Sequence, residues 1–226
     1  MSSVITTTTT PPLVDGERLG REEFHRRYLA MPHVKKAELI DGVVHMPSPV
    51  RTDVHGSPHY VTIAWLGTYS FSTPGLIGSD NGTVRLAGDN EVQPDVFLMI
   101  ERKRGGRASL EPDGYVTGGP ELAVEVAASS LSKDRNAKFR LYRDNGVSEY
   151  VLWRVEDGVI DWFVLRDGKF EALPLAEGVY KSEIFPGLWL DPAALLRDDG
   201  VAVLATLQRG IASPEHAAFV EKLRRT

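Results

Sequence analysis

Two acidic residues stand where the sequence predicts buried strands. Glu125 interrupts the apolar run LAVEVA, and Asp95 follows Pro94 at the start of the run VFLMI. Side chains alternate along a strand, so Glu125 shares a face with Ala123 and Ala127, whose small side chains leave space above the sheet. A carboxylate in that space needs a counter-charge. Two carboxylates at the edges of neighbouring strands can share a divalent cation, and their hard oxygen atoms suit Mg²⁺ or Mn²⁺.

A lysine in the segment after the Glu125 strand could reach the same place. Residues 129–145 are predicted to form a helix, and Asp134, Lys138 and Tyr142 are four apart, so they share one helix face. If that helix packs on the sheet, the Lys138 ammonium could orient or activate a water and stabilise negative charge that develops on a phosphate. Glu38, shortly before a predicted hairpin turn, could add a further carboxylate.

Each of these residues also has an ordinary structural interpretation. Asp95 after a proline is typical of a turn or a cap, Glu125 could face solvent on an edge strand, and Lys138 could be a surface lysine. Residue types and spacing alone leave both interpretations open.

His55 and His59 are four residues apart, as in zinc sites on helices. Gly56 stands where a metalloprotease places its glutamate, and Gly56 and Pro58 both weaken a helix across the pair. A structural or surface role is therefore favoured, a place beside the carboxylates is second, and zinc is third.

Composition narrows the class of protein. The chain has 226 residues, enough for one good core, and no cysteine, which excludes disulfides and thiolate metal sites and suits a reducing cytoplasm. No apolar stretch reaches the roughly 18 residues of a membrane span, and the N-terminus lacks the pattern of a secretory signal. The net charge of −5 counts against a general DNA coat, but not against an enzyme with an acidic metal site and local basic patches.

The order of the predicted elements is helix, hairpin, helix, strand, strand, helix and meander. That order indicates a mixed α/β or α+β domain with a central sheet. The Thr- and Pro-rich residues 1–16 are expected to be a disordered tail, residues 17–197 a single domain, and residues 198–226 a C-terminal helical extension.

Local signals place several of these elements. Residues 59–71 are predicted as a helix entered through Pro58, with a strand as the alternative because of their β-branched residues. The Gly-rich, charged residues 103–119 are predicted as a loop. Tight turns are expected at 41–42, 81–82, 157–158 and 167–168, a helix cap at Ser129 or Ser130, a helix stop at 145–146, and a helix start at Ser213.

The residues singled out above also carry a resemblance. The segments QPDV, ELAVEVA and SKDRNAKFRLYRDNGVSEYVLW are similar to the PD-(D/E)XK nuclease superfamily, and more narrowly to the Uma2 type of "putative restriction endonucleases". AELIDGVVHMPSP with the following His55 resembles the opening of that family, and FPGLWLDPAALL resembles its closing segment. The resemblance covers roughly residues 20–197, and the combination of motifs is specific.

The resemblance implies a restriction-endonuclease-like fold, with a mixed central sheet flanked by helices and a Mg²⁺- or Mn²⁺-dependent phosphodiesterase site. Asp95 and Glu125 match the metal-binding acids, and Glu38 matches the early glutamate of the family. The usual lysine two positions after the second acid is absent, because Ala127 stands there, and Lys138 is where this family places its lysine.

The function expected from the resemblance is a DNA endonuclease that acts as a homodimer, the commonest symmetric assembly. One alternative is a nuclease-fold protein that binds nucleic acid or a protein partner without cutting. Another is a structural or regulatory homo-oligomer whose acids serve only caps and salt bridges.

Overall fold

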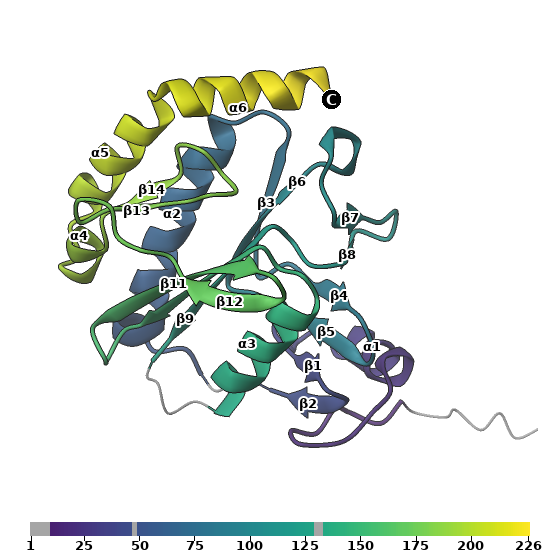
Figure 1. The fold of residues 1–226 in the computed structure, drawn as a ribbon. Coiled ribbons are helices and arrows are strands. Elements are labelled where there is room, and N and C mark those ends of the chain that lie inside the picture. The colour runs from purple at the N-terminus through teal and green to yellow at the C-terminus, as the bar shows by residue number, and fades with distance from the viewer. Residues whose placement is uncertain (1–9, 47–48, 129–132) are drawn as a thin grey trace, which may run out of the picture.

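The structure is a computed structural model that describes residues 10–46, 49–128 and 133–226. Two mixed six-stranded sheets form its body (Figure 1). The central sheet runs in the order β12 (Lys169–Ala172), β11 (Val159–Arg166), β10 (Glu149–Arg154), β9 (Leu122–Ala127), β6 (Val96–Ile100) and β3 (Leu76–Asp80). The side sheet runs in the order β2 (Val43–His45), β1 (Glu38–Ile40), β5 (Asn90–Val92), β4 (Val84–Leu86), β8 (Val116–Thr117) and β7 (Ser109–Leu110).

Helices lie on both faces of the central sheet. In the described part of the chain these are α2 (Ser57–Phe71), α3 (Lys133–Asp144), α4 (Pro192–Leu196), α5 (Gly200–Ile211) and α6 (Pro214–Arg225), with a two-stranded ribbon of β13 (Tyr180–Lys181) and β14 (Trp189–Leu190). Helix α1 (Arg21–Leu29) packs on the side sheet instead. A π-helical turn, Thr52–Gly56, leads into α2, and a 3-10 turn, Arg102–Arg104, follows β6. The predicted class, a mixed central sheet flanked by helices, is confirmed.

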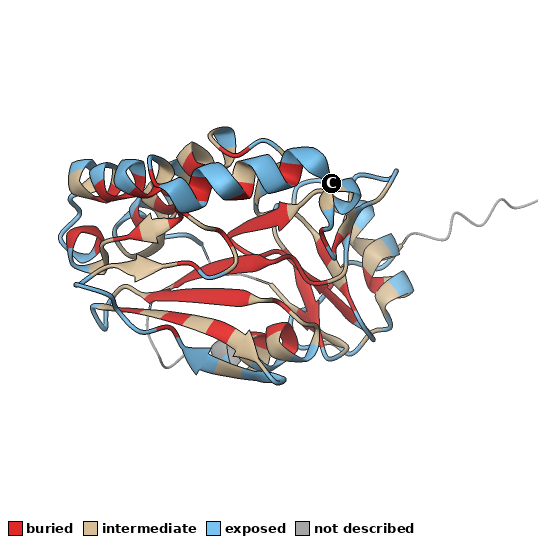
Figure 2. Cartoon of the chain, turned by 45° about the horizontal axis from the view of Figure 1, so that its top comes forward, coloured by how far each residue is buried: buried red, intermediate tan, exposed pale blue. Residues whose placement is uncertain are grey.

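The two faces of β9 pack into different cores. Leu122, Val124 and Val126 point into the cluster that α2, α4, α5 and α6 cover. Ala123, on the opposite face, packs with residues of α3 and of the side sheet. Figure 2 shows the result: buried residues run along the strands and on the inward faces of the helices. The alternation predicted for residues 122–127 therefore holds, and it sends Glu125 toward α3.

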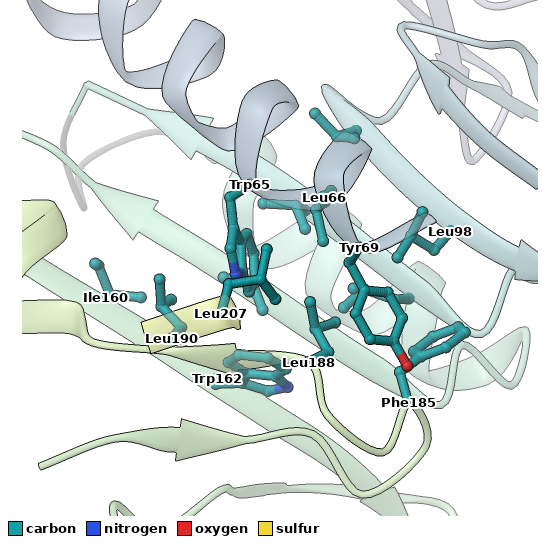
Figure 3. Close-up of a cluster of buried hydrophobic side chains, with 14 of the residues drawn as sticks. Trp65, Leu66, Tyr69, Leu98, Ile160, Trp162, Phe185, Leu188, Leu190 and Leu207 are labelled. Carbon is teal, nitrogen blue, oxygen red and sulfur yellow. The ribbon is translucent and has the colours of Figure 1, made fainter. Parts of the chain in front are cut away.

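Residues 57–71 form a helix, so the strand alternative is wrong. Thr62, Trp65, Leu66 and Tyr69 recur at helical spacing and make one buried stripe, which a strand would have split between two faces. Two of them also donate hydrogen bonds to distant carbonyls, Trp65 Nε1 to Trp189 O (3.0 Å) and Tyr69 Oη to Pro186 O (2.9 Å). Figure 3 shows three residues of this stripe, Trp65, Leu66 and Tyr69, packed with Trp162, Phe185 and Leu207.

The C-terminal segment packs on the same core. Val203 and Leu207 of α5, and Phe219 and Leu223 of α6, belong to the buried cluster that contains Trp65. In Figure 1, α5 lies beside α2, and α6 runs across the end of α2. Burying apolar surface is the main stabilising contribution in folding, so residues 198–226 contribute to the stability of the domain that precedes them.

The N-cap of α6 offers a small test of that packing. The Ser213 hydroxyl accepts a hydrogen bond from His216 N–H (3.3 Å). Ser213→Ala is expected to lower the free energy of unfolding by about 1 kcal/mol, because one terminal N–H loses its partner. Urea denaturation would measure it, with the exposed Ser57→Ala as control. Equal stability of the two variants would contradict the conclusion that residues 198–226 contribute to the stability of the domain.

The turns follow their local chemistry. Asp41 and Gly42 have φ values of 51° and 72°, and Asp167 and Gly168 have 48° and 74°, the left-handed pair that a tight hairpin requires. Gly146 at φ 71° ends α3 as predicted. The cap predicted at Ser129 or Ser130 lies outside the described residues, as do residues 1–9 of the predicted tail.

Residues 103–119 are not simply a loop. They contain β7 and β8, and β8 pairs with β4 in parallel, with Val116 opposite Val84. The reason is that Ala108 and Val116 are buried in the same apolar cluster as Val84 and Val92 of the side sheet, although glycine and charge dominate the local sequence. At the N-terminal side, Leu13 is buried beside Phe24 and Leu39. The domain boundaries at residues 16 and 197 stay predictions.

Candidate active site

Strand pairing brings Asp95 next to the strand that carries Glu125. β6 and β9 are antiparallel, with Val96 opposite Val124 and Phe97 opposite Ala123. Asp95 lies one residue before β6, and its Oδ2 accepts a hydrogen bond from the backbone N–H of Val126, the neighbour of Glu125, at 2.8 Å. The Glu125 side chain points to the α3 side of the sheet.

Asp95 is almost completely enclosed, and polar partners hold both of its carboxylate oxygens. Lys36 Nζ donates to Oδ1 at 2.8 Å, and the backbone N–H of Val126 donates to Oδ2 at 2.8 Å. His55 Nε2 lies 3.7 Å from Oδ1. Only 3% of the Asp95 side chain is exposed, so these contacts replace the water that the carboxylate lost.

Glu125 meets Lys138 and Tyr142 of α3 at one oxygen atom. Lys138 Nζ donates to Glu125 Oε1 at 2.9 Å, and Tyr142 Oη donates to the same atom at 2.6 Å. Lys138 Nζ also lies 2.8 Å from Glu38 Oε1. The helix face predicted to carry Lys138 and Tyr142 therefore packs on the sheet, over Glu125.

Glu38 joins the cluster from the side sheet. Its Oε1 accepts a hydrogen bond from Gln93 N–H at 2.7 Å, just where the chain passes from β5 toward β6. Lys138 thus links an acid of the side sheet to an acid of the central sheet. In this way the structure brings together all four side chains that the sequence singled out, Glu38, Asp95, Glu125 and Lys138, while their roles stay predictions.

Burial and charge move the pKa values in this cluster in different directions. Burial alone would raise the pKa of Asp95, but the ammonium groups of Lys36 and Lys138 outweigh it and hold that pKa below its ordinary value. Burial raises the pKa of Glu125 to about 6, because Lys138 offsets it only in part. Burial would lower the pKa of Lys138, but the Glu125 and Glu38 carboxylates raise it above its ordinary value.

The cluster has a formal charge of −1 when ionised, since three carboxylates face the two ammonium groups of Lys36 and Lys138. A bound divalent cation would change this to +1. A site with that charge attracts a phosphate anion, whereas the cluster alone does not.

A cleft of about 920 Å³ opens beside Asp95. Lys36, His55 and His59 belong both to its wall and to the surroundings of Asp95. Its lining adds the cationic side chains Lys35 and Arg51, and apolar ones that include Val34, Met46 and Val54. Arg51 is paired with Asp53 at 2.7 Å and Lys36 with Asp95 at 2.8 Å, so among these cations Lys35 has no acidic partner within the described residues.

The two histidines take part in hydrogen bonds of the fold. His55 Nδ1 lies 2.8 Å from Val126 O, and His59 Nε2 lies 2.9 Å from Asp95 O and 3.0 Å from Asp80 Oδ1. A ring nitrogen beside a carbonyl oxygen must carry the hydrogen, so these atoms donate. His55 accordingly combines a structural bond with a place at the cleft beside the acids.

The acids suit a small divalent cation by their chemistry. Within the described ranges, no group of three or more His, Asp or Glu side chains could hold a metal ion. Mg²⁺ needs less than that, because it takes one or two protein carboxylates and keeps several waters. Asp95, directly before β6, and Glu125, on the neighbouring strand β9, fit that requirement.

Comparison with known proteins decides the family. The sequence profile described as "Putative restriction endonuclease" (Uma2) matches residues 21–193. The chain belongs to this family. The family match confirms the resemblance seen in the sequence, and it spans α1, both sheets and the start of α4.

A solved structure supports the fold of this Uma2 family member. It is the crystal structure of "a putative nuclease belonging to DUF820" from Anabaena variabilis ATCC 29413, with a TM-score of 0.56 and 14% sequence identity. The match covers 76% of this chain and 96% of the other. No curated protein matches the chain. None of the helices in the described ranges is long and apolar enough to cross a membrane.

Lys36 is the residue of this family member's site that sequence reasoning missed. It precedes Glu38 by two residues, and residues two apart on an extended chain share a face. That spacing was visible in the sequence, but nothing local connects Lys36 with Asp95, which lies in another strand. Asn81, whose Oδ1 accepts from Lys36 Nζ at 3.1 Å, was expected only as a turn residue.

Proposed function

We propose that this protein is a Mg²⁺- or Mn²⁺-dependent endonuclease that hydrolyses phosphodiester bonds in DNA. The observation that supports it best is that two acids lie close together: Asp95 is bonded to the backbone of β9 beside Glu125, and Glu125 is bonded to Lys138. The cationic cleft wall beside Asp95 supports it further, because a nucleic acid presents its phosphates first. The family description and the solved relative's title point to the same class of enzyme.

Asp95 and Glu125 would hold the cation, which when bound would polarise a phosphate oxygen and lower the pKa of a water. Other residues of the chain would position these acids and bind the substrate. Lys138 orients Glu125 and balances its charge, and Glu38 anchors Lys138. Lys35 and Arg51, at the cleft wall, would bind phosphates that flank the cut bond.

Plasmid nicking would test the proposal. Wild type, Asp95→Asn and Glu125→Gln are incubated with supercoiled plasmid and Mg²⁺ or Mn²⁺, and Glu171→Gln, an exposed acid on β12, is the matched control. Nicking is expected in wild type and control, and loss of nicking in the two site variants, because each loses a metal-binding charge. Equal activity in all four proteins, or none in wild type with either cation, would reject the proposal.

A nuclease-fold protein that binds nucleic acid without cutting is the second candidate. One observation favours it: each of the two acids already has a lysine ammonium within 2.9 Å of an oxygen atom. Calorimetric titration would separate the two candidates. Tight DNA binding that survives Asp95→Asn, together with no heat on addition of Mg²⁺ or Mn²⁺ to wild type, would favour the second.

We also propose that the protein acts as a homodimer, since two copies would address the two strands of a duplex. Light scattering on the eluting protein would measure its mass. A cytoplasmic location, which the absence of cysteine suits, is part of the same proposal.

A further inference from the structure

Lys36 occupies a place that the proposed function leaves unexplained. Its ammonium sits against Asp95 Oδ1 at 2.8 Å and against Asn81 Oδ1 at 3.1 Å. Lys138 already supplies a cation to Glu38 and Glu125. The cluster therefore holds a second ammonium group whose main partner is Asp95.

The two lysines differ in where they stand. The Lys138 side chain is 9% exposed and lies between the carboxylates of Glu38 and Glu125. The Lys36 side chain is 22% exposed and forms part of the cleft wall. Lys36 therefore stands between solvent and Asp95 Oδ1, while Lys138 does not line the cleft.

The Lys36 ammonium occupies the place at Asp95 where a metal cation would bind, and it carries the same sign of charge. Asp95 Oδ2 accepts the Val126 N–H, so Oδ1 is the oxygen left for a metal ion, and Lys36 is bonded to that atom. A lysine carries its charge on a flexible four-carbon stem, so the ammonium can leave while the backbone stays in place. The cleft gives the released side chain room and solvent.

We propose that Lys36 competes with the divalent cation for Asp95 and so sets the metal affinity of the site. The inference rests on the proposed function, because it takes Asp95 as a metal ligand. Lys36 holds the carboxylate in place while no metal is bound, and a metal ion must displace it. Removal of Lys36 should then strengthen metal binding, whereas removal of a ligand weakens it.

Isothermal titration with Mn²⁺ would test this on wild type, Lys36→Met, Asp95→Asn and the control Lys35→Met. Lys35 is the neighbouring lysine of the same cleft and has no bond to an acid among the described residues. Lys36→Met is expected to bind Mn²⁺ on the order of ten- to a hundredfold more tightly, since a positive charge a few ångströms from the ion is gone. Lys35→Met should stay within about twofold of wild type, because an exposed charge is screened by salt.

Thermal melting gives a second readout that needs no activity. Lys36→Met should melt below wild type without Mn²⁺, because Asp95 loses its counter-charge. It should then gain more than wild type at a fixed Mn²⁺ concentration, because tighter binding stabilises the folded state more. Lys36→Gln, which can still donate to Asn81, repeats both measurements if the methionine variant fails to fold.

The outcomes separate this inference from the function on which it rests. Equal or weaker Mn²⁺ binding by both Lys36 variants, with binding lost in Asp95→Asn, would overturn the competition and leave the endonuclease proposal standing. Mn²⁺ binding that is the same in Asp95→Asn and wild type, or absent from every variant, would overturn the metal site and the competition with it.

Discussion

Replacing Lys138 with methionine is expected to lower the free energy of unfolding by about 3–5 kcal/mol, because it leaves buried carboxylates without their cation. Lys138 bridges Glu38 and Glu125 at 2.8 and 2.9 Å, and 11% or less of each of the three side chains is exposed. The variant should also lose nicking activity, since Glu125 loses the group that orients it. Urea denaturation at pH 7 and the plasmid assay would measure the two effects.

Two further variants make the Lys138 result specific. Arg140→Met removes an exposed cation from the same helix and should change stability by less than about 0.5 kcal/mol. The triple variant Glu38→Gln, Glu125→Gln, Lys138→Met removes all three charges, so most of the lost stability should return. If Lys138→Met is as stable as Arg140→Met, the buried ion cluster does not contribute as described.

Stability is expected to fall by about 3 kcal/mol between pH 4.5 and pH 7 through one residue outside the site, Glu149. This glutamate of β10 is fully buried and accepts hydrogen bonds from the Ser182 hydroxyl and from the backbone N–H groups of Glu183 and Ile184. Burial raises its pKa from 4.5 to about 7. The pKa of Glu149 thus differs by about 2.5 between the unfolded and the folded chain, and a pKa difference of one corresponds to about 1.36 kcal/mol, which gives the stated loss.

The sign follows from which state binds the proton more tightly. Below pH 4.5 the carboxyl is protonated in both the folded and the unfolded chain, and the folded state has its full stability. Between pH 4.5 and about 7 the unfolded chain gives up the proton while the folded chain keeps it, so stability falls as the pH rises. Above about pH 7 both forms are ionised and the loss is complete.

Glu149→Gln should flatten this part of the stability profile, because the amide mimics the protonated acid and can donate to Ser182 Oγ. Other titrating groups, including Glu125 and Asp95, act equally in both proteins, so the difference between the wild-type and variant curves isolates Glu149. Urea denaturation from pH 4.5 to 7.5 would measure it, with the exposed Glu171→Gln as control. Parallel curves for wild type and Glu149→Gln would show that Glu149 has an ordinary pKa.

Local sequence signals predicted the elements well because their causes are local. Alternation identified β9 and the face that carries Glu125, and Asp-Gly pairs placed the hairpins because those residues adopt positive φ at low cost. The four-residue spacing of Lys138 and Tyr142 put them on one face of α3. The prediction failed at residues 103–119 because β7 and β8 depend on partners that the local sequence does not show: they pair with each other, and β8 pairs with the distant β4.

The sequence by itself determined which residues could do chemistry: two acids on buried strands, a lysine on the following helix and an early glutamate. The tertiary structure decided that Asp95 bonds to the strand that carries Glu125, that Lys36 reaches Asp95, and that α5 and α6 share the core of α2. The physical reason is that strand register and helix packing join residues far apart in the chain. Their energies depend on the shape and burial of both partners, which no local spacing contains.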